Sequence, residues 1–143
     1  MNGAVVVDAS LAVKLLVREV QSDLAVSLTR GWLRQGVCVV APYLMLVEVS
    51  NALFQKARRG QLAITSAGSL LDSLLNENLI LLEPPGIHSR ALELAHILQQ
   101  RAAYDSHYLA LADSLDCEYW TADERYYRAA SGDHPRVRWI GEF

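Results

Sequence analysis

The sequence has little cysteine and no long hydrophobic run. Only Cys38 and Cys117 occur, in apolar surroundings and without a CxxC spacing, so we expect neither a disulfide framework nor a thiolate metal site. We expect both thiols to be buried, reduced and unreactive. No apolar run approaches the roughly 18 residues that cross a bilayer, and the N-terminus lacks the basic region and cleavage site of a signal peptide. The sequence therefore predicts a cytoplasmic protein with no membrane association.

The chain also lacks an excess of positive charge. Its 13 basic and 16 acidic residues give a net charge of −3, which does not favour binding nucleic acid through bulk electrostatics. This objection weakens if several acids converge on metal ions, because a bound divalent cation is often the strongest local charge. The phosphate-binding loops GxxxxGK[ST] and GxGxxG and the metal-binding pattern HExxH are absent.

The composition is that of one folded domain. Hydrophobic residues make up 52% of the 143 residues and charged residues 20%, a balance that can fill a core. A chain of this length leaves no room for a second core of comparable size. We expect a single domain over residues 1–143.

Short apolar segments alternate with amphipathic ones along the whole chain. The predicted strands are residues 4–8, 37–41, 79–82, 118–121 and 137–140. The predicted helices are one capped by Ser10, then residues 19–33, 42–59, 65–75, 88–101, 105–115 and 123–130. Strands separated by helices require right-handed crossovers, so the sequence predicts an α/β fold, a three-layer α/β/α sandwich with a mostly parallel sheet.

Four acidic residues stand at notable places in this pattern. Asp8 closes the first strand, Asp123 follows the strand that ends at Thr121, and Asp105 opens a helix. Glu48 is a charge inside the apolar stretch YLMLVEVSNAL. Because ligands of parallel sheets bind at the carboxyl ends of the strands, we expect these side chains to meet there.

Each acid also has a simpler explanation. Asp8, Asp105 and Asp123 suit helix capping, and Glu48 suits an arginine partner or a position that reaches water. Taken together, four carboxylates in one cleft repel one another and raise their own pKa values unless cations lie between them. Oxygen ligands favour Mg²⁺ or Mn²⁺, so the sequence predicts a site for one of these ions.

The segments VVVDAS with LAVKLL, VEVSNAL, YDSHYLALAD and WTADERYYRA resemble PIN-domain proteins, in particular the VapC-like toxins of toxin–antitoxin pairs. The resemblance spans nearly the whole chain. It implies a PIN-like fold, Mg²⁺- or Mn²⁺-dependent endoribonuclease activity on RNA, a homodimer and a cognate antitoxin. By position it also implies that the catalytic, metal-binding acids are Asp8, Glu48, Asp105 and Asp123.

Other residues are expected to support this site. Ser10 and Thr121 stand where the family often has a hydroxyl lining the site, and Asn51 lies one helical turn after Glu48. Asp113 lies two turns after Asp105; we expect a surface acid there, with a metal role left open. The histidines 88, 96, 107 and 134 are expected to be ordinary structural or surface residues.

Two alternatives remain. The first is a non-catalytic PIN scaffold that binds RNA or a protein partner. The second is a metal-dependent phosphatase on a similar sheet, which is disfavoured because Asp8-Ala9-Ser10 lacks the second aspartate of a DxD motif.

Overall fold

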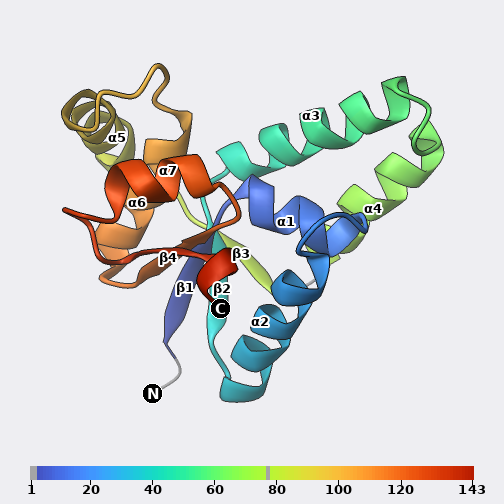
Figure 1. The fold of residues 1–143 in the computed structure, drawn as a ribbon, viewed down its shortest axis with the longest axis horizontal. Helices are drawn as coiled ribbons and strands as arrows, with labels where there is room; N and C mark the ends of the chain where they lie inside the picture. Colours follow the sequence, from blue (N-terminus) through green and yellow to red (C-terminus); the bar gives the residue numbers. More distant parts are fainter. Residues whose placement is uncertain (1–2, 77) are drawn as a thin grey trace.

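A parallel β-sheet forms the middle layer of the protein (Figure 1). The structure is a computed structural model that describes residues 3–76 and 78–143, and in these residues five strands form one sheet. The strands are β1 (Ala4–Val7), β2 (Cys38–Ala41), β3 (Leu79–Leu81), β4 (Glu118–Thr121) and β5 (Val137–Trp139). Their order is β3-β2-β1-β4-β5, and every neighbouring pair is parallel. The predicted parallel sheet is confirmed.

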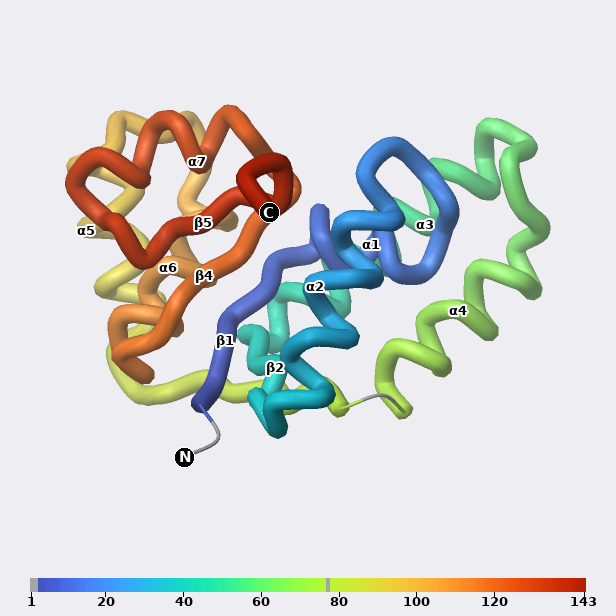
Figure 2. The backbone as a smooth tube through the Cα atoms, turned by 60° about the horizontal axis from the view of Figure 1, so that its bottom comes forward, coloured from blue at the N-terminus to red at the C-terminus, as the bar shows by residue number. Residues whose placement is uncertain are grey.

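Helices cover both faces of the sheet (Figures 1 and 2). One layer contains α1 (Ala9–Leu16), α2 (Ser22–Gln35), α3 (Leu44–Arg58) and α4 (Ile64–Asn76). The other contains α5 (Ile87–Ile97), α6 (Tyr104–Leu115) and α7 (Glu124–Ala130), and the chain ends in a short 3-10 helix, Ile140–Glu142. This division follows from right-handed crossovers, because β1, β2 and β3 step across the sheet in one direction whereas β4 and β5 lie on the other side of β1. The predicted three-layer sandwich is confirmed.

The reversal of strand order falls between β1 and β4. The chain that follows β1 crosses one face of the sheet, and the chain that follows β4 crosses the opposite face. No single crossover therefore covers the carboxyl ends of both strands. Such a point is where open parallel sheets form a ligand-binding crevice. Asp8 and Thr121 lie at the ends of β1 and β4, at this expected ligand position, which is called the crevice below.

Several helix boundaries differ from the prediction, and the helix expected over residues 19–33 spans Ser22–Gln35. The first helix begins at Ala9 rather than after Ser10, because the Asp8 side chain acts as its N-cap and accepts a hydrogen bond from the Leu11 backbone N–H at 3.1 Å. Helix α5 ends at Ile97 instead of residue 101, because Gln99 takes a left-handed backbone conformation with φ 54°. The first turn of α5 also begins one residue early, at Ile87.

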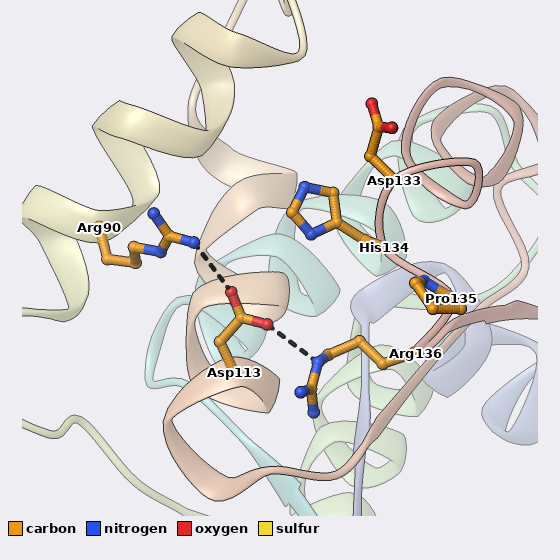
Figure 3. Close-up of a pocket in the computed structure, with 6 residues that line it drawn as sticks. All are labelled: Arg90, Asp113, Asp133, His134, Pro135 and Arg136. Atoms are coloured by element: carbon orange, nitrogen blue, oxygen red, sulfur yellow. Dashed lines mark hydrogen bonds and ion pairs between the residues drawn. The ribbon is translucent and has the colours of Figure 1, made fainter.

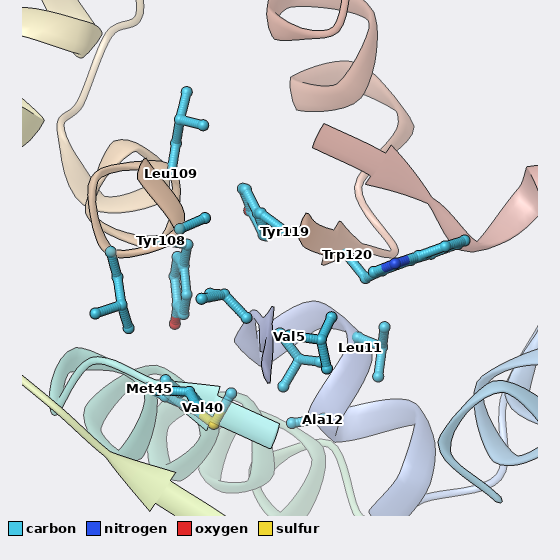
Figure 4. Packing of buried hydrophobic residues seen from close by; sticks show 14 of the residues in the cluster. Val5, Leu11, Ala12, Val40, Met45, Tyr108, Leu109, Tyr119 and Trp120 are labelled. Carbon is cyan, nitrogen blue, oxygen red and sulfur yellow. The ribbon is translucent and has the colours of Figure 1, made fainter. Parts of the chain in front are cut away.

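The core lies between the central strand and the two helical layers (Figure 4). Val5, Val6 and Val7 of β1 are all buried, so this strand packs on both faces, as its continuous apolar run predicts. Helix α6 contributes Tyr108, Leu109 and Leu111 to the core from one side. Met45 and Val49 of α3 and Leu11 of α1 belong to the same cluster. Among the described residues, no helix is long and apolar enough to cross a membrane.

The prediction that both cysteines are buried is wrong for Cys38. This residue is the first of β2, at the amino-terminal end of the strand, and its side chain is exposed. Cys117 is half-buried between α6 and β4, and burial raises the pKa of its thiol, which keeps it in the less reactive protonated form.

We predict that Leu109→Ala strongly destabilises the protein. The Leu109 side chain is fully buried, so its removal loses apolar burial and leaves a cavity, at a cost of about 2–5 kcal/mol in the free energy of unfolding. Urea denaturation followed by circular dichroism measures this change. Leu92→Ala is the matched control, because Leu92 on α5 is 66% exposed and its loss should cost about 0.5 kcal/mol or less. Equal losses in the two variants would contradict the assignment of the core.

Candidate active site

Asp8 lies buried at the carboxyl end of β1 and accepts four hydrogen bonds. Its Oδ1 accepts from Ser10 Oγ at 2.6 Å and from Leu11 N at 3.1 Å. Its Oδ2 accepts from the Tyr119 hydroxyl at 2.7 Å and from the Thr121 hydroxyl. Burial raises the pKa of Asp8, and these hydrogen bonds oppose that rise. The capping interpretation of Asp8 is thus only part of its role, since three of its four donors are side-chain hydroxyls.

The hydroxyls of Ser10 and Thr121 also position the segment that follows β4. Ser10 Oγ accepts a hydrogen bond from the Ala122 backbone N–H at 3.0 Å. Thr121 Oγ1 accepts one from the Asp123 backbone N–H at 2.9 Å. Each hydroxyl therefore donates to Asp8 and accepts from the backbone beside Asp123. These hydrogen bonds fix the positions of Asp8 and Asp123, at the ends of β1 and β4, relative to each other.

Glu48 reaches toward the same crevice from α3. Its Oε1 accepts a hydrogen bond at 2.5 Å from the hydroxyl of Tyr108, which comes from α6 on the other face of the sheet. Burial raises the pKa of Glu48 and the nearby charge of Asp8 raises it further, while the bond from Tyr108 opposes this. The ring of Tyr108 stacks on Tyr119, with centroids 5.8 Å apart and planes 21° apart. Two stacked tyrosines thus donate to the two acids, one to Glu48 and the other to Asp8.

Asp105 lies in the first turn of α6. Apart from the fully buried Asp8, it is the acid whose pKa is raised most strongly. Burial raises its pKa to about 7, with further contributions from Asp8, Glu48 and Asp123. The helix begins at Tyr104, and its N-cap residue Ala103 makes no side-chain capping bond, so the capping interpretation of Asp105 is wrong. The charges of Asp8, Glu48 and Asp123 add to the effect of burial, so the four acids lie within electrostatic reach of one another.

Asp123 does act as a helix cap. Its Oδ1 accepts from the backbone N–H groups of Arg125 and Tyr126, at 3.0 and 3.2 Å, at the start of α7. Asn51, predicted to assist Glu48, is exposed on α3, and its Oδ1 accepts a 3.5 Å hydrogen bond from Gln55. Asn51 therefore stands apart from the hydrogen-bond network of Asp8.

The chemistry of these four residues fits a hard divalent cation. Among residues 3–76 and 78–143, no lysine or arginine lies within 4.0 Å of the carboxylate of Asp8, Glu48, Asp105 or Asp123. Asp8 is buried and the other three acids are half-buried. Carboxylate oxygens that repel one another and have no cationic partner are suitable ligands for Mg²⁺ or Mn²⁺. Their spacing is wider than a coordination shell, since no three acidic, histidine or cysteine side chains of the described residues lie close enough to hold an ion.

Asp113 faces a different part of the protein (Figure 3). It lies eight residues after Asp105, about 12 Å along the helix axis. Its carboxylate is paired with Arg90 at 3.4 Å and with Arg136 at 2.9 Å, beside a cavity of about 440 Å³ that His134 also lines. Asp113 is a half-buried ion-pair partner, and the metal role left open for it is not supported.

The sequence interpretation missed the role of two tyrosines. Tyr108 and Tyr119 carry typical core signals, one on an apolar helix and one in a short strand, and both rings are fully buried. Their hydroxyls nevertheless donate hydrogen bonds to Glu48 and Asp8. A buried tyrosine hydroxyl needs a hydrogen-bond partner, and here the carboxylates, which have no cationic partner among the described residues, accept that bond.

We predict that Asp105→Asn stabilises the protein in EDTA, more at pH 8 than at pH 5. The pKa of Asp105 is about 7 in the folded protein, above its usual value of 3.8, so folding favours the protonated carboxyl. Wild-type stability should therefore fall as the pH rises from about 4 to about 7, and asparagine removes that loss. A shift of this size corresponds to at most about 4 kcal/mol, and partial exposure reduces our expectation to about 1–2 kcal/mol.

Urea denaturation at both pH values measures this effect. Asp72→Asn, at an exposed position on α4, is the control and should give the same small change at pH 5 and pH 8. An Asp105→Asn variant that gains no more stability at pH 8 than at pH 5 would contradict the raised pKa of Asp105.

Comparison with known proteins places the chain in a family. The family model of the PIN domain matches residues 5–132. The fold is similar to that of PAE2754 from Pyrobaculum aerophilum, with 22% identity, a TM-score of 0.70, and coverage of 99% of this chain and 94% of that one. It is also similar to VapC20 from Mycobacterium tuberculosis, a Sarcin-Ricin loop cleaving toxin, with 16% identity, a TM-score of 0.63, and coverage of 88% and 95%.

A search of curated proteins found no significant match. The two structural likenesses, at their low identities, show a shared fold. The PIN-domain match covers nearly the whole chain, and it includes all four acids of the crevice. This chain belongs to the PIN-domain family, as its sequence motifs predict.

Proposed function

We propose that this protein is an endoribonuclease that hydrolyses RNA phosphodiester bonds with Mg²⁺ or Mn²⁺, and that it is the toxin of a toxin–antitoxin pair. The observation that carries the proposal is the set of four carboxylates at the strand-order reversal, which no lysine or arginine of the described residues neutralises. PIN-domain membership and the fold shared with VapC20, a Sarcin-Ricin loop cleaving toxin, support the same reaction and biological role.

The four acids differ in how readily they would hold the cation. Asp105 has no hydrogen-bond donor among the described residues, Glu48 has one, and Asp123 uses one oxygen for capping. Asp8 already accepts four hydrogen bonds, which is roughly the full capacity of a carboxylate. We infer that Asp105, Glu48 and Asp123 bind the cation directly, and that Asp8 joins them when a hydroxyl such as that of Thr121 turns away.

A divalent cation in this crevice would lower the pKa of an attacking water and stabilise the charge that builds on the phosphate. The protein's own residues supply the positioning. The hydroxyls of Tyr108 and Tyr119 hold Glu48 and Asp8, and Ser10 and Thr121 hold the Asp123 segment. Asp105, with a pKa of about 7, would lose its proton when the cation binds, because an adjacent positive charge favours the carboxylate.

The proposal includes two kinds of protein contact, a homodimer and a cognate antitoxin. Large apolar side chains are exposed along one stripe of α3, at Val47 and Phe54, and Tyr43 precedes the helix on the same stripe. Positions three, four and seven residues apart lie on one helical face, so these side chains form an apolar strip beside Glu48 that Ser50 and Asn51 interrupt. Exposed apolar strips of this kind are typical of protein–protein interfaces.

Cleavage of end-labelled structured and single-stranded RNAs tests the proposed activity. We expect discrete cuts with Mg²⁺ or Mn²⁺ and none with EDTA. Asp105→Asn should lower the rate at least about 100-fold, because losing even an outer partner of a metal ligand costs about 10–100-fold in affinity or activity. Asp72→Asn should cut like the wild type. Metal-independent cutting, or undiminished cutting by Asp105→Asn, would refute the proposal.

If no RNA is cut, a second measurement, of metal binding, distinguishes the remaining explanations. If calorimetry then shows no binding of Mn²⁺, the protein is the non-catalytic PIN scaffold that binds RNA or a partner. If Mn²⁺ binds and Asp105→Asn abolishes that binding, the metal site stands and the substrate range must be widened.

The homodimer has its own test. One chain has a mass of 15.9 kDa, so sedimentation equilibrium should give a mass near twice this value. Val47→Asp would place a charge in the apolar strip of α3 and should shift the equilibrium to the monomer. A wild-type mass of one chain at all concentrations would contradict the proposed dimer.

A further inference from the structure

A buried hydrogen bond joins α6, which carries Asp105, to α7, which Asp123 caps. Ser106 of α6 and Tyr126 of α7 are both buried, and their side-chain oxygens lie 3.2 Å apart. No other hydrogen bond connects α6 with α7 in the part of the chain that the structure describes. This pair of hydroxyls is therefore the direct polar link between the two helices.

The Ser106 hydroxyl differs from other hydroxyls inside the helices of this protein. Thr29, Ser50 and Ser69 each donate to the backbone carbonyl four residues earlier in their own helix, a common arrangement for a helical hydroxyl. Ser106 makes no such bond among the described residues, and its partner is Tyr126. The fold thus directs this hydroxyl to the neighbouring helix rather than to its own.

Each end of the link lies next to an acid of the crevice. Ser106 directly follows Asp105, and the Tyr126 backbone N–H donates to Asp123 Oδ1 at 3.2 Å. Burial raises the pKa of Tyr126 to about 12; the bond with Ser106 opposes this rise, and the charge of Asp105 adds to it. The phenol of Tyr126 therefore lies within electrostatic reach of Asp105, while its backbone holds Asp123.

Asp105 depends on such a link because it has little else to fix its place. Its carboxylate accepts no hydrogen bond among the described residues, and the N-cap Ala103 makes no side-chain capping bond at the start of α6. Asp123, by contrast, is held by two backbone N–H groups. The position of Asp105 relative to Asp123 is therefore set through the residues around it.

We propose that Ser106 and Tyr126 are positioning residues of the metal site, whose hydrogen bond sets the separation of Asp105 and Asp123 across which a divalent cation binds. This inference rests on the metal-dependent function proposed above. Both side chains are buried, so they act through the two acids and not on RNA. Loss of an outer partner of metal ligands typically costs about 10–100-fold in metal affinity.

Calorimetry with Mn²⁺ on the full chain tests this role. Tyr126→Phe removes the hydroxyl and keeps the ring, and it should weaken Mn²⁺ binding about 10-fold. Ser106→Ala should have a similar effect. The double variant should bind no more weakly than either single variant, because all three lose the same hydrogen bond. Tyr127→Phe is the matched control and should bind as the wild type does, because its hydroxyl bonds to Glu142 and not to α6.

Urea denaturation of the same variants separates positioning from a purely structural role. Each single variant leaves one buried hydroxyl without its partner, whereas the double variant removes both. The double variant should therefore recover part of the lost stability. Its Mn²⁺ affinity should stay as low as in the single variants, because the link between the two helices is still missing.

Two results would overturn the proposal while leaving the metal site intact. One is a Tyr126→Phe variant that binds Mn²⁺ as tightly as the wild type. The other is a double variant whose Mn²⁺ affinity recovers together with its stability, since the pair would then serve packing alone. A wild-type protein that binds no Mn²⁺ would instead contradict the proposed metal site, and this inference with it.

Discussion

Burial of carboxylates near one another, at Asp8, Glu48, Asp105 and Asp123, is the constraint on which the crevice depends. The strand-order reversal between β1 and β4 brings these acids together, and the described residues offer them no lysine or arginine as an ion-pair partner. The protein stabilises two of them with hydroxyl donors and leaves Asp105 with a pKa of about 7. A charge arrangement that costs stability without a cation is consistent with a site built to bind one.

The hydroxyl donors also connect the two helical layers across the crevice. Glu48 comes from α3 on one face and accepts from Tyr108 of α6 on the other. Tyr108 stacks on Tyr119, whose hydroxyl reaches Asp8, and Tyr119 in turn packs against Tyr126 of α7 with ring centroids 6.0 Å apart. These rigid aromatic side chains have few rotamers, so they fix the acids more firmly than flexible donors would. Core packing and acid positioning therefore depend on the same residues.

The sequence was sufficient to predict the sheet, the layers and the place of the acids, because strand ends and helix starts are local patterns. Asp8 follows an unbroken apolar run, and Asp123 follows a short strand, so both had to lie at the same edge. Contacts between distant residues left no such pattern. The bond from Tyr108 to Glu48 spans 60 residues, and the pairing of Asp113 with Arg136 spans 23, so neither periodicity nor spacing could indicate them. The exposure of Cys38, at the amino-terminal end of β2, likewise depends on the packing around the strand and not on the local sequence.

The most direct test of the account is an NMR titration of the Asp105 side-chain carboxyl carbon, with and without Mg²⁺. The account predicts a pKa of about 7 without the ion and a clearly lower pKa with Mg²⁺ present, because the cation neutralises the surrounding carboxylates and favours the ionised form. A pKa near 4 without Mg²⁺ would show that the four acids do not share one environment. A raised pKa that Mg²⁺ leaves unchanged would contradict the assignment of the crevice as a metal site.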